Sequence, residues 1–209
     1  MRVGVLASGQ GTNLQALLDT LHGGVIEVVA VATDQPGARA LERAAGASVP
    51  ARAFERGAYE TRAARDAAIA DWLVERDVGL IVLAGYMAIL DDAFLERFAG
   101  RIVNVHPSLL PAFPGVRAVE QALAYGVKVF GVTVHYVEPG EVDSGPIILQ
   151  GSVEVPGATD PAEVLAALRP IEHALLPRAV ALIAAGAVRR DAGHPRRVVI
   201  DDAVAGDLA

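Results

Sequence analysis

Residues 3–14 read VGVLASGQGTNL, and the order of features in this stretch decides the fold class. Residues 3–6 form an apolar, β-branched run that is typical of a buried strand. A loop with two glycines follows, and leucines then repeat at helical spacing until Gly23 and Gly24 end the helix. A strand, a glycine loop and a helix in this order predict the first unit of a parallel α/β sheet.

The same alternation continues through the first half of the chain. Apolar runs at residues 26–32, 80–83 and 102–106 alternate with helical patterns at residues 38–45 and 59–76. Strands joined by helices form right-handed crossovers, which bury a parallel sheet on both faces. We therefore expect an α/β fold with a mostly parallel, twisted sheet that is Rossmann-like in its N-terminal half and has helices on both faces.

The second half departs from this alternation after Gly126. Two strand-like runs, at residues 127–137 and 147–155, predict antiparallel strands at one edge of the sheet. Two closing helices are expected at residues 161–168 and 171–185, interrupted by a proline between them.

Length and composition define the class of protein. With 209 residues and 53% hydrophobic content, the chain suits a single domain over residues 1–188, followed by a charged, loosely held C-terminal extension over residues 189–209. The absence of cysteine excludes disulfides, thiolate metal sites and a cysteine nucleophile. The five histidines lack the spacing of a zinc motif, so no metal is expected.

Charge and hydropathy limit the kinds of partner that this chain is expected to bind. A net charge of −7 without a basic stripe argues against nucleic acid as a partner. No stretch has the length and apolar character of a membrane span, and the N-terminus does not resemble a signal peptide. We expect a cytoplasmic protein, a monomer or weak homodimer, that acts on small molecules.

The glycine loop at residues 8–13 is the first candidate site. Backbone N–H groups and the helix dipole favour an anion at such a position. The loop is not a dinucleotide fingerprint, because Leu14 occupies the place of the third glycine, and it is not a P-loop. Three interpretations remain: a tight turn with a helix cap, a phosphate cradle at Gly11, Thr12 and Asn13, or an NAD-binding module with Asp34 as the ribose ligand.

The second candidate site is residues 104–111, NVHPSLLP. In extended backbone, Asn104 and His106 point to the same face. Pro107 ends the strand, because it removes the next ladder donor and holds His106 extended. Ligands bind at such strand ends in open α/β sheets. The alternative is a buried histidine followed by a proline-rich turn.

Five motifs together resemble one known family. In chain order they are SGQGTNLQ at residues 8–15, LAGYM at 83–87, NVHPSLLP at 104–111, DSGP at 143–146 and EH at 172–173. This set resembles the folate-dependent formyltransferases over residues 1–188, in the order found in purine-pathway members. The resemblance implies formyl transfer from 10-formyltetrahydrofolate to the amine of glycinamide ribonucleotide (GAR), giving formyl-GAR in de novo purine (IMP) synthesis. It also implies a cis Leu110–Pro111 bond.

The chemistry of that reaction assigns roles to three side chains. An amine that attacks a formyl carbon creates a tetrahedral oxyanion, which needs fixed hydrogen-bond donors. The Asn104 amide and a protonated His106 are such donors on one face. Asp143 would hold His106 charged and oriented if the two side chains lie close together. We therefore expect Asn104, His106 and Asp143 to be the catalytic residues.

The resemblance also implies ligand contacts. It places the GAR phosphate at Gly11, Thr12 and Asn13, and further GAR contacts at Arg169, Pro170, Ile171 and Glu172. The residues implied for folate are Arg62, Met87, Ala88, Ile89, Leu90, Asn104, Glu138, Pro139, Gly140, Glu141, Val142 and Asp143.

This chain departs from the family at two places. The family commonly has lysine or arginine at the position of Ala88. The loop between His135 and Asp143 is one residue longer than usual.

Three other functions compete with GAR formylation. A formyltetrahydrofolate deformylase would share most of the motifs but normally has a preceding regulatory domain. A methionyl-tRNA formyltransferase would need a second, RNA-facing domain, for which this acidic chain is too short. A non-catalytic nucleotide-binding module would explain the glycine loop but neither His106 nor Asp143.

Overall fold

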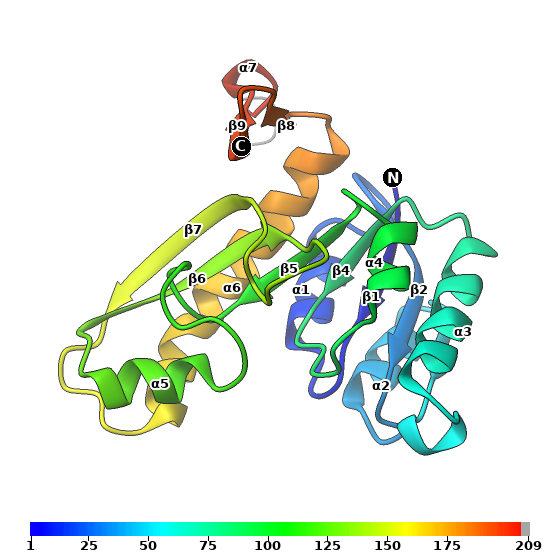
Figure 1. The fold of residues 1–209 in the computed structure, drawn as a ribbon, viewed down its shortest axis with the longest axis horizontal. Coiled ribbons are helices and arrows are strands. Elements are labelled where there is room, and N and C mark those ends of the chain that lie inside the picture. The colour runs from blue at the N-terminus through cyan, green and yellow to red at the C-terminus, as the bar shows by residue number, and fades with distance from the viewer. Residues whose placement is uncertain (206–209) are drawn as a thin grey trace. The chain divides into compact units, whose positions relative to one another are not determined.

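The computed structural model describes residues 1–205, and these fall into two compact units that divide between Asn104 and Val105 (Figure 1). Strands hydrogen-bond in the order β3-β2-β1-β4-β5-β6-β7. The predicted α/β class, with a mostly parallel sheet and antiparallel strands at its edge, is confirmed.

The first unit is built on parallel strands. They are β1 (Arg2–Leu6), β2 (Glu27–Thr33), β3 (Ala51–Ala53), β4 (Leu80–Leu83) and β5 (Ile102–His106), whose last two residues belong to the second unit. β1 is central, because Val5 lies opposite Val31 of β2 and Val82 of β4. All three valines are fully buried, as expected for a parallel sheet covered on both faces.

Helices connect these strands. They are α1 (Thr12–Thr20), α2 (Arg39–Gly46), the short 3₁₀ helix η1 (Arg56–Ala58), α3 (Arg62–Val74) and α4 (Asp92–Arg97). The Thr61 hydroxyl accepts from Ala64 N at 3.1 Å and begins α3, and Asp91 accepts from Phe94 N at 2.8 Å and begins α4. α1 packs beside α2, and α3 packs beside α4.

The second unit contains the antiparallel pair β6 (Val129–Tyr136) and β7 (Ile147–Glu154), with helices α5 (Ala118–Tyr125) and α6 (Pro161–Ala184). Helix α6 packs against both strands. Gly151 of β7 permits this approach, because a Cβ there would lie only 2.7 Å from Cγ2 of Ile171.

One expectation for the second half is wrong, and one helix there was not predicted. The sequence predicts two helices separated at Pro170, but α6 is one continuous helix that contains both Pro170 and Pro177. Each proline removes one hydrogen bond, and packing against β6 and β7 compensates for the loss. Helix α5 was not anticipated.

The C-terminal segment contains more structure than the expected loose extension. β8 (Val188–Asp191) and β9 (His194–Ile200) form an antiparallel hairpin, followed by the short helix α7 (Asp202–Ala205). The predicted domain over residues 1–188, with its boundary at that point, remains a prediction. The implied cis bond at Leu110–Pro111 is confirmed. Within residues 1–205, no helix combines the length and the apolar character that crossing a membrane requires.

Candidate active site

Asp143 lies at the centre of a buried polar cluster in the second unit. Its Oδ2 is 3.2 Å from Nδ1 of His106 and accepts a hydrogen bond from Gly115 N at 2.8 Å. Its Oδ1 is 3.5 Å from Nε2 of His135. The side chains of His106, Asp143 and His135 are 6%, 9% and 1% exposed. The close approach of His106 and Asp143, on which the predicted role of Asp143 depends, is therefore present.

Local backbone geometry brings Asp143 to this position. β6 ends at Tyr136, and the chain returns into β7 through a loop that we call the 138–144 loop. Tyr136 N donates to Pro146 O at 2.9 Å and closes the base of this loop. Only glycine fits at residue 145, because a Cβ there would lie 1.8 Å from the Tyr136 carbonyl oxygen. Asp143 itself has a φ of 56°.

The surroundings of Asp143 keep it ionised. Burial alone would raise the pKa of its carboxyl group, but the hydrogen bond from His135, the charge of His106 and the Gly115 N–H together lower that pKa below the usual 3.8. A carboxylate in contact with two imidazoles fixes the orientation of both rings.

Both histidines contact an acceptor at each ring nitrogen. Nε2 of His106 lies 2.9 Å from the carbonyl oxygen of Phe113, and Nδ1 of His135 lies 2.9 Å from that of Tyr136. Each ring satisfies both of its contacts only when both nitrogens carry a hydrogen. His106 thus presents an N–H donor toward a carbonyl oxygen, which is the donor character that the chemistry requires.

Sequence reasoning missed His135, Gly115 and Phe113. His135 lies in the apolar run VFGVTVHY of β6, where it resembles a core residue, and no short motif includes it. A buried imidazole in such a strand is nevertheless a signal, because it needs a polar partner.

Asn104 lies two positions before His106 in β5. Asn104 is the one residue of β5 that is partly exposed, and both of its neighbours and His106 are buried. The prediction that Asn104 and His106 face the same side remains a prediction. Asn104 ends the first unit, and His106 belongs to the second.

The glycine loop has the geometry of a helix N-terminus. Gly11 is the N-cap of α1 with a φ of 66°, and Thr12 and Asn13 form the first turn of the helix. A Cβ at Gly11 would lie 2.9 Å from Cα of Ala40, so both the positive φ and the approach of α2 require glycine. The N–H groups of this first turn are the donors expected for a phosphate.

Asp34 is fully engaged within the first unit. Its Oδ1 accepts from the Ser8 hydroxyl at 2.5 Å, and its Oδ2 accepts from Arg56 at 2.9 and 3.1 Å and from Gln35 at 3.2 Å. Burial opposes ionisation, but these hydrogen bonds together lower the pKa of Asp34. Both oxygens therefore have protein partners, which weighs against Asp34 as a ribose ligand in an NAD-binding module.

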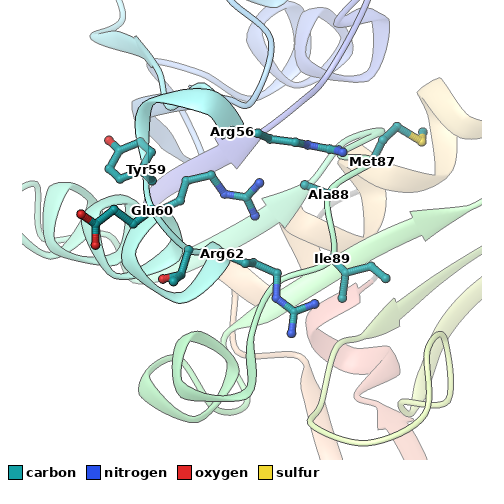
Figure 2. Close-up of a pocket in the computed structure, with 9 residues that line it drawn as sticks. Arg56, Tyr59, Glu60, Arg62, Met87, Ala88 and Ile89 are labelled. Atoms are coloured by element: carbon teal, nitrogen blue, oxygen red, sulfur yellow. The ribbon is translucent and has the colours of Figure 1, made fainter.

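Four residues implied for folate line one cavity of about 410 Å³ in the first unit. Figure 2 shows Arg62, at the start of α3, and the segment Met87, Ala88 and Ile89 around this space. Leu90 does not line the cavity and is 7% exposed. The other lining residues are Arg56, Tyr59, Glu60, Thr61 and Arg65.

The arginines that line this cavity differ in whether they form ion pairs. Arg56 is paired with Asp34, and Arg65 is paired with the buried Asp66 at 2.6 Å. In the described part of the chain, no ion pair engages Arg62. Arg62 is therefore available to an anionic group.

The other implied ligand residues lie in the second unit. Arg169 and Pro170 are exposed on α6, and Ile171 and Glu172 are partly buried there. Glu138 is ion-paired with Arg190. Of the remaining loop residues implied for folate, Pro139, Gly140, Glu141 and Val142 are exposed.

Within residues 1–205, the structure brings together no group of three or more His, Cys, Asp or Glu side chains that could hold a metal ion. The expectation of a metal-free site remains a prediction.

Comparison with known proteins gives one family. The profile of the formyl transferase family matches residues 1–180. A phosphoribosylglycinamide formyltransferase from Mycobacterium tuberculosis (strain ATCC 25618 / H37Rv) is 44% identical over 203 residues, which cover 95% of this chain and 94% of that protein. The enzyme of that name from Haemophilus influenzae is 40% identical over 190 residues, covering 90% and 89% of the two chains.

Solved structures agree with the sequence relatives. The crystal structure of glycinamide ribonucleotide transformylase 1 from Symbiobacterium toebii is 46% identical and has a TM-score of 0.90, covering 96% of this chain and 93% of that one. This chain also resembles the trifunctional purine biosynthetic protein adenosine-3 of Drosophila pseudoobscura pseudoobscura, with 42% identity over 193 residues, but it spans 14% of that protein's length.

Proposed function

This chain belongs to the formyl transferase family, and from that premise we propose that it transfers the formyl group of 10-formyltetrahydrofolate to the amine of GAR, giving formyl-GAR in de novo purine synthesis. The observation that carries the proposal is the position of Asp143 between His106 and His135, at 3.2 and 3.5 Å. The other activities of the much longer trifunctional relatives are not part of it.

His106 and Asn104 act as the two oxyanion donors. The amine nitrogen attacks the formyl carbon, and the formyl oxygen becomes an anion that accepts from both side chains. In this structure Nε2 of His106 donates to the Phe113 carbonyl oxygen. The formyl oxygen takes the place of that carbonyl oxygen when the donor binds.

Asp143 maintains the charge and orientation of His106 through this step. The bond from the formyl carbon to the folate nitrogen breaks as the new carbon–nitrogen bond becomes an amide. One proton leaves the attacking amine and one proton reaches the departing folate nitrogen, so the reaction neither consumes nor releases a net proton. General acid–base help of this kind is worth about 10²–10⁴-fold in rate.

The substrates bind through the residues that the family resemblance implies. The GAR phosphate binds at the N-terminus of α1, on Gly11, Thr12 and Asn13, because the N–H groups of a helix N-terminus and the helix dipole favour an anion there. The central part of α6, from Arg169 to Glu172, supplies further GAR contacts. The formyl donor uses the cavity beside Arg62, where an unpaired guanidinium suits a carboxylate.

The test measures consumption of a 10-formyl folate donor by the purified protein, with and without GAR. Consumption is monitored through the change in the absorbance of the donor. Consumption that requires GAR supports the proposal. Consumption without GAR would instead identify a deformylase, and no consumption under either condition would favour a binding module. Asp143→Ala serves as the control, and it should abolish GAR-dependent consumption while the protein remains folded. The cytoplasmic location and the monomeric or weakly dimeric state remain predictions.

A further inference from the structure

The C-terminal hairpin, β8 and β9, contacts the 138–144 loop near both of its ends. Near the start of the loop, Arg190 forms an ion pair with Glu138, and its guanidinium carbon lies 5.0 Å from the ring centroid of Tyr136. At the end of the loop, Nη2 of Arg196 donates to the carbonyl oxygen of Ser144 at 2.8 Å. Ser144 directly follows Asp143, so the hairpin holds the chain one residue from the buried carboxylate.

We propose that Arg190 and Arg196 are positioning residues, which hold the 138–144 loop so that Asp143 reaches His106 and His135. This proposal rests on the proposed function for its catalytic consequence. It concerns two residues that do not touch the reacting atoms and act only through the loop.

The loop needs such support from outside. Glycine at residue 140 adopts a φ of 116°, and Asp143 adopts a φ of 56°, a left-handed conformation that a non-glycine residue rarely takes. Residues 139–142 are exposed, so they bury little surface that could fix the loop. Strained backbone of this kind persists only where surrounding contacts hold it.

The two arginines are placed against the loop by their own contacts and not by a regular strand alternation. Arg190 of β8 is paired with Val198 of β9, and the register shifts between Arg190 and Asp191, so Arg196 lies in the irregular part of β9. Arg189 is paired with Val199. Arg197 is 3.8 Å from Asp191 within the hairpin itself and is 68% exposed.

The other arginines of the hairpin supply matched controls. Arg190→Ala and Arg196→Ala each remove one loop contact, and Arg189→Ala and Arg197→Ala each remove the same charge elsewhere in the hairpin. Arg190→Lys and Arg196→Lys keep a charged donor at the two loop-facing positions.

The experiment measures two quantities on the full chain. The first is steady-state turnover, with kcat and the KM values for GAR and for the formyl donor. The second is hydrogen exchange of residues 137–146 followed by mass spectrometry, which needs no turnover. A displacement of about 1 Å at a catalytic group can cost about 100-fold in rate.

We expect the double Arg190→Ala, Arg196→Ala variant to lose about 10- to 100-fold in kcat. The KM for the donor should rise, the KM for GAR should stay within about twofold, and exchange in residues 137–146 should accelerate. The two lysine variants should restore most of the rate. A merely structural role would lower the folded fraction and leave both KM values unchanged.

Three results would overturn the proposal. One is a double variant whose kcat stays within twofold of wild type. Another is an equal loss of kcat in Arg189→Ala and Arg197→Ala, which would indicate a general charge effect. If wild-type protein shows no GAR-dependent turnover, the proposed function fails separately, and unchanged exchange in residues 137–146 of the double variant then overturns the positioning role.

Discussion

Replacing His135 by leucine removes one of the two imidazoles that contact Asp143. His135 is 1% exposed, and leucine is similar in size, so the change tests the polar contact more than the packing. The hydrogen bond from His135 is the largest of the interactions that lower the pKa of Asp143. Without it, the carboxylate still has His106 and the Gly115 N–H among its partners.

The expected size of the effect follows from the geometry. A hydrogen bond to a charged group contributes about 1.5–3 kcal/mol, and the 3.5 Å contact is long, so the lower end of that range applies. We therefore expect the free energy of unfolding at pH 7 to fall by about 1.5 kcal/mol. If the orientation of His106 depends on the same carboxylate, kcat falls by about tenfold.

The dependence on pH has a definite sign. The pKa of Asp143 in the folded protein lies below its ordinary value of 3.8. Its contribution to stability is therefore fully present above pH 3.8 and is lost as pH falls through the folded-state pKa. The difference in unfolding free energy between wild type and His135→Leu should shrink as pH falls below about 4.

Urea unfolding followed by circular dichroism at pH 7, 5 and 3.5 measures this difference. His135→Gln is the control, because its amide can donate to Asp143 without carrying a charge, and it should lie between wild type and His135→Leu. A difference that stays the same size from pH 7 to pH 3.5 would refute the electrostatic reasoning and assign the whole effect to packing.

Further outcomes follow from other parts of the structure. Asp143→Asn should lower kcat by about 10²–10⁴-fold, and a near-normal kcat would contradict its proposed role. Because it removes the charge that both imidazoles contact, it should also lower the free energy of unfolding by about 1.5 kcal/mol or more. Gly11→Ala should destabilise the fold by at least about 1–2 kcal/mol and raise the KM for GAR, because the new Cβ meets Ala40 and residue 11 has a positive φ. Calorimetry measures the stability, and Gly9→Ala is the control because the space around its Cβ is open. Ala88→Arg should lower the KM for a polyglutamylated donor by about two- to fivefold relative to a monoglutamylated one, and equal KM values would argue against a carboxylate site in the cavity.

The parallel half of the fold was accessible to sequence reasoning because its strands are buried on both faces. The run LIVL at residues 80–83 forms β4 with the same limits, whereas the buried Arg65–Asp66 ion pair on α3 was not expected. The expected break at Pro170 is absent because the rule that proline interrupts a helix considers only local hydrogen bonds. The packing of α6 on β7, through Ile171 and Gly151, is a long-range contact that no local pattern contains.

The candidate site shows the same division. His106 and Asp143 lie in recognisable motifs, but the distance between them depends on how the 138–144 loop folds back. His135 was missed because seven of the eight residues of β6 are buried, and the sequence of the strand is typical of a hydrophobic core. The β8–β9 hairpin was missed because its exposed, arginine-rich strands lack the alternation of a half-buried sheet.

The closed base of the 138–144 loop also bears on how this family varies in chain length. The Tyr136–Pro146 hydrogen bond and the contact that only Gly145 permits fix the two chain segments below the loop. An inserted residue at the exposed tip changes the loop closure entropy by only a small amount. Evolution can therefore lengthen or shorten the tip and alter what it recognises, while Asp143 stays anchored beside the base. Insertions between Asp143 and Pro146 have no such freedom, and we expect length variation to be confined to the segment before Asp143.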